Sequence, residues 1–372
     1  MTFTSKTLKT LLLKSLNMVD IVKVLKEMKP EIDVLIEKYI PRRFDESTIE
    51  FIAGKPRYKY HVESLQKAIA DPIWEFLDRG GKRWRPALFL LIVEALGGDR
   101  EKLKDFCIVP ELVHNGTLLI DDVEDNSDFR RGKPCSHKIF GMDIALNASN
   151  ALYYLPLIVF IKKQNELEAE TLVEAYETYV QEMIRISFGQ AMDIAWHRGI
   201  AGADEIDEGE YLQMCAYKTG TLARMAAKLA AVLCGAKKEE VEKIGKFAET
   251  IGVAFQIQDD ILNLIGEEKY GKEIGGDISE GKRTLMVIHT LQNASEEDKR
   301  RLIEILNMHT KDQALINEAI DIMKRYGAIG YAKKRAKEIM EEAWQDVEPI
   351  LKEGEAKEKL RAFAEFLINR EY

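Results

Sequence analysis

Hydrophobic residues recur at helical spacing along most of the chain. From Met18 to about Ile40, apolar side chains stand three and four residues apart, which places them on one face of an α-helix. The same spacing predicts further helices at His61–Leu77, Ala87–Leu96, Lys104–Asp125, Glu166–Ile186, Thr221–Cys234, Glu239–Leu264, Lys282–Leu291 and Ala328–Leu351. No proline occurs between Pro156 and Pro349, and alternating strand patterns are scarce there. The sequence therefore predicts an all-α protein.

The chain shows no repeat of fixed period and no low-complexity linker. We therefore expect one large helical bundle over residues 46–372, preceded by an N-terminal extension and first helix over residues 1–45. Residues 1–17 contain lysines and hydroxyl side chains but no acidic residue and no arginine. This composition fits an organelle-targeting segment, although the missing arginine favours an overlong gene start or a short extra helix.

The composition of the chain argues against some classes of function. The 372 residues are 46% hydrophobic and 31% charged, as in globular proteins, and carry a net charge of −9. This charge argues against nucleic-acid binding, but local Lys and Arg or bound divalent cations can still attract a polyphosphate. The longest apolar runs, Ala87–Val93 and Ala151–Ile161, are too short to span a bilayer, so no integral membrane segment is expected. Four widely spaced cysteines without a CxxC pair indicate a reducing, cytoplasmic location.

An acidic cluster ends the predicted helix at Lys104–Asp125. Asp121 and Asp125 are one turn apart, so their Cβ atoms lie roughly 5–6 Å apart on one face, with Asp122 beside them. Carboxylates this close repel one another unless a cation joins them. Mg²⁺ is the expected cofactor because it binds one or two carboxylates and shares the oxygens of substrate phosphates. A solvated acidic helix end would give the same short pattern.

A second acidic pair repeats this plan. Asp259 and Asp260 end the apolar helix at Glu239–Leu264, and Asn263 stands one turn after Asp259. Metal sites of helical bundles are built in the bundle core from side chains on facing helices. We therefore expect the two acidic helix faces to lie opposite each other across the core.

Basic turns accompany the acidic motifs. The segment RGGKRWRP at Arg79–Pro86 contains four basic residues, and RRGKP at Arg130–Pro134 follows the first acidic cluster. The forked guanidinium group of arginine matches the geometry of phosphate oxygens. The combination predicts a diphosphate ligand.

Several blocks of the sequence together resemble the trans-isoprenyl diphosphate synthases, the polyprenyl synthetase family, most closely its geranylgeranyl diphosphate synthases. The blocks occur in the family's order and are GGKRWRP (80–86), HNGTLLIDDVED (114–125), RRGKP (130–134), SFGQAMDIAW (187–196), YKTGTL (217–222), FQIQDDILNL (255–264) and GGDISEGKRT (275–284). The resemblance implies the isoprenoid synthase fold, a helical bundle around a central cavity. It also implies a prenyltransferase that condenses isopentenyl diphosphate with an allylic diphosphate.

The resemblance gives each matching residue an expected role. The residues expected to hold isopentenyl diphosphate without a metal are Lys82, Arg85, His114 and Arg131. The residues expected to bind Mg²⁺ on the allylic diphosphate are Asp121, Asp122, Asp125 and Asp259, and those completing this clamp are Arg130, Lys218, Lys272 and Lys282. Lys218, Thr219 and Gln256 are the expected catalytic residues, since the Thr219 hydroxyl and the Gln256 amide oxygen can offer dipoles to a carbocation. Gln190 and Asp193 are expected as supports or as a polar contact between helices.

The implied reaction is an ionisation followed by condensation and elimination. Metal and cations stabilise the departing diphosphate, so the allylic C–O bond ionises in a water-poor cavity. The isopentenyl double bond then attacks the carbocation, and loss of a proton, for which the released diphosphate can serve as base, ends the cycle. The family usually forms homodimers, so a homodimer or higher homo-oligomer is expected.

Product length should depend on the residues below the first acidic motif. A helix rises about 1.5 Å per residue, so Gly116 and Thr117 lie about one turn below Asp121. Both are small, so we expect this turn to leave room for the growing chain, and Gly116→Phe to shorten the product. The expected product is geranylgeranyl diphosphate or longer. Asn263 stands where many relatives carry aspartate, whereas relatives of the geranylgeranyl branch also carry asparagine there. Metal binding in the second motif is therefore expected to rest on Asp259.

Two alternatives remain open. Asp259, Asn263 and Glu267 have nearly the spacing of the second metal triad of class I terpene cyclases, which share the all-α fold. A cyclase, however, holds no isopentenyl diphosphate and would not need the basic cluster around Arg85. The other alternative is a non-catalytic subunit of a heteromeric prenyl diphosphate synthase. Such a subunit is expected to lose the first acidic motif or the basic clamp, and this chain keeps both.

Overall fold

The computed structural model describes residues 19–265 and 274–368. Glu267 and Lys272 lie outside the described residues, so the role expected for Lys272 stays a prediction. The contacts between residues divide the chain into two compact units. We call Asp20–Glu177 with Leu229–Lys237 the N-terminal unit, and Thr178–Lys228 with the chain from Lys238 onward the C-terminal unit. The division expected near residue 45 stays a prediction.

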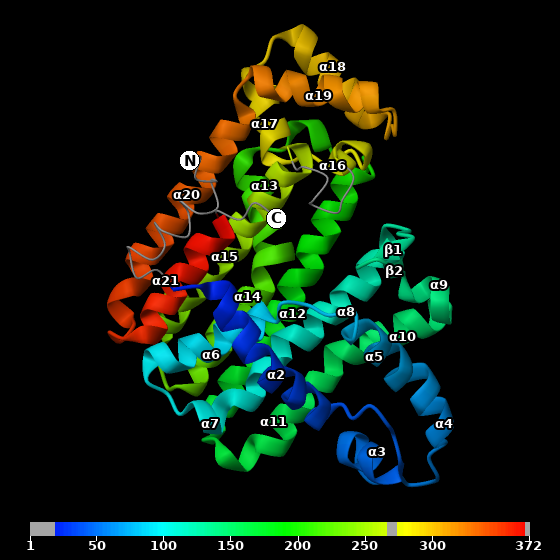
Figure 1. Ribbon diagram of the computed structural model, residues 1–372, viewed down its shortest axis with the longest axis vertical. Coiled ribbons are helices and arrows are strands. Elements are labelled where there is room, and N and C mark those ends of the chain that lie inside the picture. Colours follow the sequence, from blue (N-terminus) through cyan, green and yellow to red (C-terminus); the bar gives the residue numbers. More distant parts are fainter. Residues whose placement is uncertain (1–18, 266–273, 369–372) are drawn as a thin grey trace, which may run out of the picture. The chain divides into compact units, whose positions relative to one another are not determined.

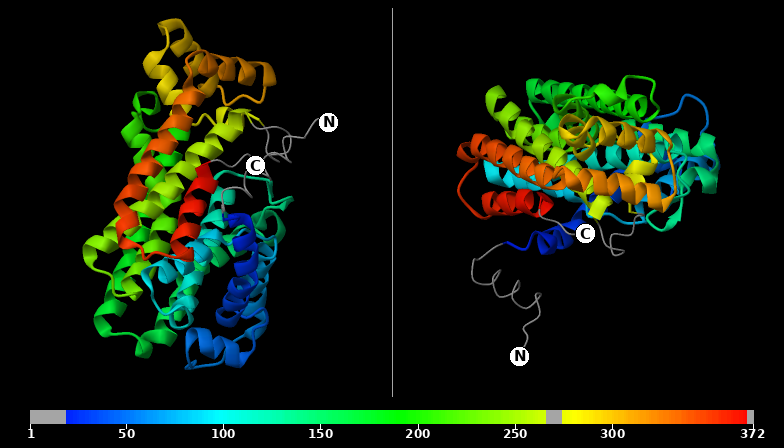
Figure 2. Two further views of the ribbon diagram at one scale, coloured as in Figure 1. Left: turned by 60° about the vertical axis from the view of Figure 1, so that its left-hand side comes forward. Right: turned by 90° about the horizontal axis from the view of Figure 1, so that it is seen from above.

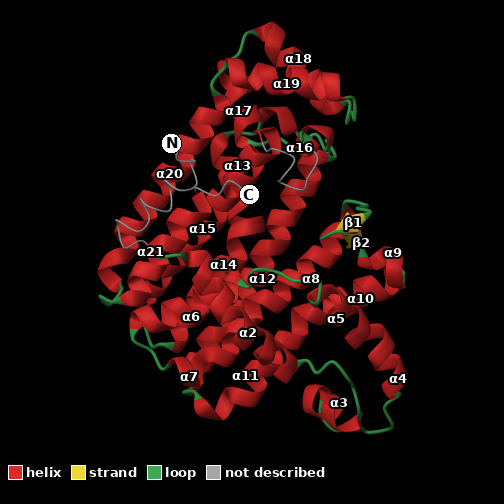
Figure 3. Cartoon of the chain, in the orientation of Figure 1, coloured by secondary structure: helices red, strands yellow, loops and turns green. Residues whose placement is uncertain are grey.

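The N-terminal unit is helical apart from one small hairpin (Figures 1 and 3). Its elements are α2 (Ile21–Tyr39), α3 (Glu46–Ala53), α4 (Val62–Leu65), the π-helix η1 (Gln66–Ala70), α5 (Asp71–Leu77), α6 (Trp84–Leu96), α7 (Arg100–Leu103), η2 (Lys104–Cys107), α8 (Ile108–Glu124), β1 (Phe129–Arg130), β2 (Lys133–Pro134), α9 (Ser136–Phe140), α10 (Met142–Tyr154), η3 (Leu155–Leu157), α11 (Ile158–Lys163) and η4 (Gln164–Glu166). The helix α12 (Ala169–His197) begins in this unit and continues into the C-terminal unit.

The described residues of the C-terminal unit form helices joined by loops and turns, without a strand (Figures 1 and 3). Besides α12, its elements are η5 (Ala203–Glu205), α13 (Glu208–Cys215), the π-helix η6 (Ala216–Gly220), α14 (Thr221–Leu233, ending in the N-terminal unit), α15 (Lys238–Ile265), α16 (Gly276–Ser279), α17 (Leu285–Asn293), α18 (Glu296–Asn307), α19 (Gln313–Arg325), α20 (Ala328–Val347), η8 (Glu348–Ile350) and α21 (Glu355–Ile368). The all-α prediction is therefore confirmed.

Helix α6 is the apolar centre of the N-terminal unit. Every residue from Ala87 to Val93 is at most 1% exposed. A helix that is hydrophobic on all sides must be surrounded, and α6 packs against α2 and α8. The helix ends as the sequence predicts, because Gly97 adopts the left-handed conformation (φ 72°) and the Gly98 N–H donates to Val93 O.

Helix α8, which carries the first acidic motif, packs closely against α10 at Gly116. The Ser149 hydroxyl donates to Gly116 O over 2.7 Å. A Cβ atom on Gly116 would lie 3.0 Å from Leu152 Cβ and 3.1 Å from the Tyr153 ring. The expectation that Gly116 leaves space for a substrate is therefore wrong, because the missing side chain lets α10 approach.

In the C-terminal unit, α15 lies beside α20 and α21 (Figure 2). The rings of Phe247 on α15 and Trp344 on α20 meet edge to face, with their centres 5.6 Å apart. Aromatic pairs of this geometry add about 0.5–1.5 kcal/mol beyond the area they bury. This packing fixes α15, which carries the second acidic motif.

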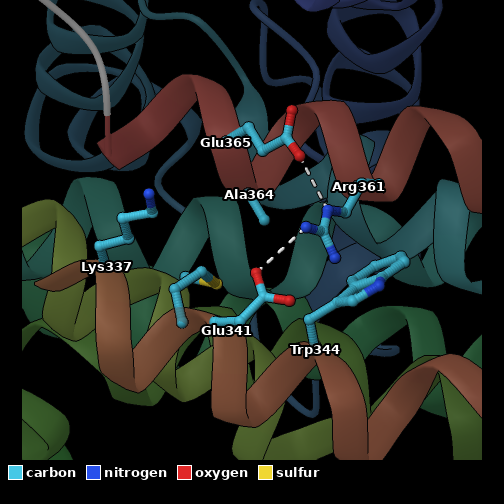
Figure 4. Close-up of a pocket in the computed structure, with 7 residues that line it drawn as sticks. Lys337, Glu341, Trp344, Arg361, Ala364 and Glu365 are labelled. Atoms are coloured by element: carbon cyan, nitrogen blue, oxygen red, sulfur yellow. Dashed lines mark hydrogen bonds and ion pairs between the residues drawn. The ribbon is translucent and has the colours of Figure 1, made fainter.

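A pocket of about 560 Å³ lies between α20 and α21 (Figure 4). Arg361 lies 5.1 Å from the centre of the Trp344 ring and donates hydrogen bonds to Glu341 and Glu365. These two carboxylates offset the positive charge of Arg361. The pocket is therefore a poor site for an anion, and its lining includes none of the predicted site residues.

Among the described residues, one segment, Met142–Glu166, is long and apolar enough to cross a membrane by length and composition alone, whereas the sequence predicts none. It comprises α10, η3, α11 and η4, with Pro156 in the middle. In the protein, 44% of its apolar window is buried, and α10 packs on α8. A single segment of this kind is weak support for a membrane span.

Candidate active site

Two arginine side chains join the two basic turns. The fully buried Arg79 side chain donates to the carbonyl oxygens of Pro134 (2.8 Å) and Arg130 (3.2 Å), one in each strand of the hairpin. Arg131 in turn donates to Gly80 O. The turn after α5 and the β1–β2 hairpin are therefore fixed to each other. This places four predicted residues in one part of the N-terminal unit: Lys82, Arg85, Arg130 and Arg131.

Arg83 and Arg85 have different surroundings although they are almost adjacent. Arg83 (φ 52°) directly precedes α6, and its buried guanidinium donates to Asp33 Oδ1 (2.8 Å) and Glu111 Oε1 (2.9 Å). Arg85 is only 6% exposed, and among the described residues its Nε atom has no hydrogen-bond partner. A buried donor without a partner is costly, so Arg85 is well suited to bind an anion.

His114 on α8 belongs to the same basic cluster. Burial, together with the neighbouring guanidinium groups of Arg85 and Arg131, holds the pKa of His114 well below its usual range. The imidazole is therefore neutral near pH 7 and offers one N–H donor to an anion. The cluster of Arg85, His114 and Arg131 can bind a diphosphate without a metal.

This environment of His114 predicts a pH-dependent stability. A histidine whose pKa is lowered by folding makes the unfolded state bind more protons, so stability falls as pH drops below the unfolded value of about 6.5. We expect the unfolding free energy to lose up to about 1.4 kcal/mol per pH unit below that value. Thermal unfolding of the His114→Asn variant from pH 7.5 to 5.5 should show a flatter profile. His61→Asn, at an exposed N-cap where Asn is also a good acceptor, should keep the wild-type profile, and an equally steep His114→Asn profile would contradict the assignment.

The three aspartates of the first acidic motif differ in their surroundings. Asp122 is 1% exposed, and its Oδ1 accepts a 2.6 Å hydrogen bond from Arg130 Nε. The Asp121 carboxylate is 22% exposed and lies 3.3 Å from Arg130 Nη2. Asp125 is exposed at the end of α8. Asp122 therefore holds Arg130 in place, and its part in metal binding stays a prediction, whereas Asp121 and Asp125 are accessible to a cation.

The donor set of this motif fits Mg²⁺. Asp121 and Asp125 supply carboxylate oxygens one helical turn apart. In the part of the chain that the structure describes, no three His, Cys, Asp or Glu side chains form a complete metal site. Mg²⁺ is usually held by one or two carboxylates, with waters and substrate phosphates filling the remaining positions. The residues present are sufficient for that type of binding.

The segment YKTG of the C-terminal unit forms a π-helix, η6, between α13 and α14. π-Helical turns are rare and often occur at functional sites. Glycines on both sides allow the close packing of η6: a Cβ atom on Gly189 would lie 2.2 Å from Lys218 N, and one on Gly252 would lie 2.5 Å from Gly220 Cα. Lys218 and Thr219 are therefore fixed between α12 and α15.

A small cavity of about 50 Å³ lies beside η6. Its lining includes four of the predicted residues: Lys218, Thr219, Gln256 and Lys282. Lys218 forms an ion pair with Asp193, and Lys282 forms ion pairs with Asp277 and Glu280. Asp193 is thereby placed as a partner of Lys218. The C-terminal unit thus brings together the expected catalytic residues, of which Lys218 also belongs to the expected clamp, and a second clamp residue, Lys282.

The two aspartates of the second acidic motif also differ. Asp259 is half-buried on α15, whereas Asp260 is 4% exposed. Both Asp260 oxygens accept hydrogen bonds, Oδ2 from the Tyr211 hydroxyl (2.7 Å) and Oδ1 from Gln256 Nε2 (2.8 Å). Burial raises the pKa of the Asp260 carboxyl, and the nearby Asp277 adds to this effect. Asp259 is therefore the more accessible of the pair, and its expected part in metal binding stays a prediction.

A hydrogen bond made by the Asn263 side chain explains why an amide is sufficient at this position. Its Oδ1 accepts the N–H of Asp277 (3.1 Å), and its carbonyl accepts the N–H of Gly275 (2.8 Å). These bonds attach the start of α16 to the end of α15. Asn263 can fill this role without a negative charge.

Sequence reasoning missed several residues that hold the site together. They are Arg79, Arg83, Tyr211 and Arg283. Arg283 is 7% exposed and donates to Asp204, Asn307 and Gly281 O, which fixes the loop that carries Lys282. No spacing in the sequence separates these structural arginines from their ligand-binding neighbours, because both kinds occur in the same short motifs.

Comparisons with known proteins show the family to which the chain belongs. Residues 66–323 match the model of a family described as polyprenyl synthetase. The chain is 36% identical to the short chain isoprenyl diphosphate synthase of Methanothermobacter thermautotrophicus, over 83% of this chain and 95% of the relative. It is 35% identical to the geranylgeranyl pyrophosphate synthase of Geoglobus acetivorans, over 80% and 89% of the two chains.

A solved structure extends the similarity to the fold. The geranylgeranyl pyrophosphate synthetase of Pyrococcus horikoshii is 30% identical to this chain, with a TM-score of 0.81 over 94% of this chain and 98% of that one. The family model covers more than half of the chain, and the first of these relatives exceeds 30% identity over most of both sequences. Together with the all-α fold, these similarities show that the protein is a trans-prenyltransferase of the polyprenyl synthetase family.

Proposed function

We propose that the protein condenses isopentenyl diphosphate with an allylic diphosphate in a Mg²⁺-dependent reaction. The observation that carries this proposal is Arg85, a buried guanidinium whose Nε lacks a partner within the described residues, beside His114 and Arg131. A second diphosphate that binds without metal explains such a cluster. A terpene cyclase has only one diphosphate substrate and would leave this buried charge unused.

The first diphosphate-binding group lies in the N-terminal unit. Arg85 and Arg131 donate to the diphosphate of isopentenyl diphosphate, and neutral His114 adds one N–H donor. Lys82, an exposed side chain of the same turn, adds a further positive charge. Desolvated charge-assisted hydrogen bonds of this kind hold the nucleophile in one orientation for attack.

The allylic diphosphate binds to residues of both acidic motifs. We infer that Asp121, Asp125 and Asp259 hold Mg²⁺, and that Arg130, Lys218 and Lys282 donate to the same diphosphate. When bound, Mg²⁺ neutralises charge on the diphosphate and stabilises it as a leaving group. Arg130 stays oriented during this step because Asp122 binds its Nε.

The polar groups beside η6 stabilise the carbocation. Once the C–O bond has ionised, positive charge develops on the allylic carbon. The oxygens of Thr219 and Gln256 direct negative ends of dipoles at that charge, and their fixed positions require little reorganisation. The isopentenyl double bond attacks, and the released diphosphate accepts the proton that is lost.

The proposed product is geranylgeranyl diphosphate or a longer chain. Thr117 stands four residues before Asp121 on α8, so it lies on the same face, below the expected metal site. We predict that Thr117→Phe shortens the product, because a ring at this position fills the path of the growing chain. Chromatography of the dephosphorylated products measures the chain length, and an unchanged product would contradict the assignment.

Gly116→Phe should instead lower Tm, since it separates α8 from α10 at a cost of about 1–3 kcal/mol or more.

We also infer a homo-oligomer, at least a dimer. Helix α12 exposes four apolar side chains on one face: Val173 (55%), Val180 (54%), Ile184 (46%) and Phe188 (61%). A stripe of this length on a helix is typical of a buried interface. The mass measured by light scattering should be at least twice that of the chain, and Ile184→Asp should reduce it. A wild-type monomer would contradict the inference.

A cytoplasmic location is part of the proposal. All four cysteines lie in described residues and are free thiols. Free, mostly buried thiols are typical of proteins in reducing compartments.

One assay tests the function. The wild-type protein is incubated with labelled isopentenyl diphosphate, an allylic primer and Mg²⁺, and the products are treated with phosphatase. The proposal predicts chain-extended alcohols. A cyclic hydrocarbon would indicate a cyclase, and the absence of any product would indicate a non-catalytic subunit; either result overturns the proposal.

A further inference from the structure

Four side chains from three elements form a continuous hydrogen-bond chain beside the η6 cavity. The Tyr211 hydroxyl (α13) donates to Asp260 Oδ2 over 2.7 Å. Gln256 Nε2 (α15) donates to Asp260 Oδ1 over 2.8 Å, and the Thr219 hydroxyl (η6) donates to Gln256 Oε1 over 2.9 Å. All four residues line the cavity. The chain links a deeply buried phenol to the two dipoles expected to meet the carbocation.

The bonds fix which end of the Gln256 amide points in each direction. An ionised Asp260 accepts from both of its partners, so the amide nitrogen faces Asp260 and the amide oxygen faces Thr219. A flipped amide would set Oε1 against a carboxylate oxygen and lose the bond to Asp260. The Thr219 hydroxyl has a single hydrogen, and it is used by Gln256. The Thr219 oxygen can therefore present only lone pairs to a neighbouring cation.

Tyr211 is the outer end of this chain. It is 1% exposed, among the largest fully buried side chains, and α13, which carries it, contacts both η6 and α15. Asp260 would lose one of its two donors without the hydroxyl and could turn about its side-chain bonds. Gln256 would then have no fixed partner on its nitrogen side.

We propose that Tyr211 is a positioning residue that acts through Asp260 to orient Gln256 and Thr219 toward the allylic carbocation. This inference rests on the proposed prenyltransferase function. It assigns Asp260 to the hydrogen-bond chain, because both of its oxygens are occupied by donors. Tyr211 itself does not touch the substrate, so its effect should appear in turnover and not in the binding of isopentenyl diphosphate.

The test is Tyr211→Phe, which removes only the hydroxyl. The chain offers a matched control in Tyr39, which is 2% exposed and whose hydroxyl likewise donates to a buried carboxylate, Asp105 Oδ2 (2.6 Å), in the N-terminal unit. Both variants should show lower Tm. Only Tyr211→Phe should lower kcat, by about 10- to 100-fold, as expected for misplaced catalytic groups. The KM for isopentenyl diphosphate should stay within about twofold of the wild type.

A double variant separates positioning from a general loss of stability. Thr219→Val removes the last hydroxyl of the chain, and the Tyr211→Phe/Thr219→Val variant should be no slower than Thr219→Val alone. The inference would be overturned if the kcat losses of the two single substitutions multiplied in the double variant. It would also be overturned if Tyr211→Phe and Tyr39→Phe lost kcat equally. A wild-type kcat in Tyr211→Phe would overturn it as well. Wild-type activity in the same assay tests the proposed function separately.

Asp260→Asn provides an independent test should Tyr211→Phe not fold. Because the Asp260 oxygens serve the hydrogen-bond chain, the variant should lose kcat while the Mg²⁺ concentration that gives half-maximal rate stays unchanged. A large increase in that concentration would make Asp260 a metal ligand and overturn the proposal.

Discussion

Replacing Asp121 by Asn should lower kcat by about 10³-fold or more without unfolding the protein. The Asp121 carboxylate is partly exposed at the end of α8, next to Asp125 and the buried Asp122. Removing its charge weakens the hold on the metal that stabilises the leaving diphosphate. It also relieves repulsion between neighbouring carboxylates, so Tm should be unchanged or higher.

Asp128→Asn is the matched control for this prediction. Asp128 follows the same motif, is 74% exposed and forms a surface ion pair with Lys138 at 3.2 Å. The same change of charge there should leave kcat within about twofold of the wild type, because exposed ion pairs contribute about 0–1 kcal/mol. Equal effects of the two substitutions would show that net charge, and not the Asp121 site, controls the rate.

Replacing Arg85 by Met should raise the KM for isopentenyl diphosphate by about 10²-fold, since truncating one partner of a buried charge pair costs about 2–5 kcal/mol of binding. In the free enzyme, burial lowers the pKa of Arg85 to about 10, and Arg131 nearby adds to this effect. Removing a buried cation whose Nε lacks a partner in the described chain should not lower Tm. Steady-state kinetics and thermal unfolding measure the two effects.

Arg83→Met provides the contrast for the same turn. Its guanidinium is held by Asp33 and Glu111, so its loss leaves a buried carboxylate without its partner. The expected cost is about 3–5 kcal/mol of unfolding free energy. A lower Tm in Arg85→Met, or an unchanged KM, would contradict the assignment of Arg85 to the substrate.

The position of α15 was predictable because its apolar residues recur regularly at helical spacing, whereas α10, α18 and α19 were not among the predicted helices. Residues 238–265 form α15 within one residue of the predicted bounds at each end. The β1–β2 hairpin and the π-helix η6 were not predicted, because each depends on contacts made by distant residues. Arg79 ties the hairpin to the turn after α5, and Gly189 and Gly252 allow the packing of η6.

The chemistry of the site was predictable by residue type but not by individual partner. Each acidic motif contains a DD pair, and sequence cannot say which member is buried. In the structure, Asp122 accepts a hydrogen bond from Arg130, and Asp260 accepts hydrogen bonds from Tyr211 and Gln256. Gly116 was misread for the same reason, since a small residue can mark either a cavity or a close helix contact.

The central claim is that the protein binds two diphosphates in different ways, one without metal and one with it. Calorimetric titration of the wild-type protein with isopentenyl diphosphate, and with an allylic diphosphate made unreactive by a bridging sulfur, measures this directly in EDTA and in Mg²⁺. The account predicts that isopentenyl diphosphate binds with similar affinity in both conditions, while the allylic analogue binds only with Mg²⁺. Isopentenyl diphosphate that fails to bind in EDTA, or an allylic analogue that binds equally well in it, would contradict the account.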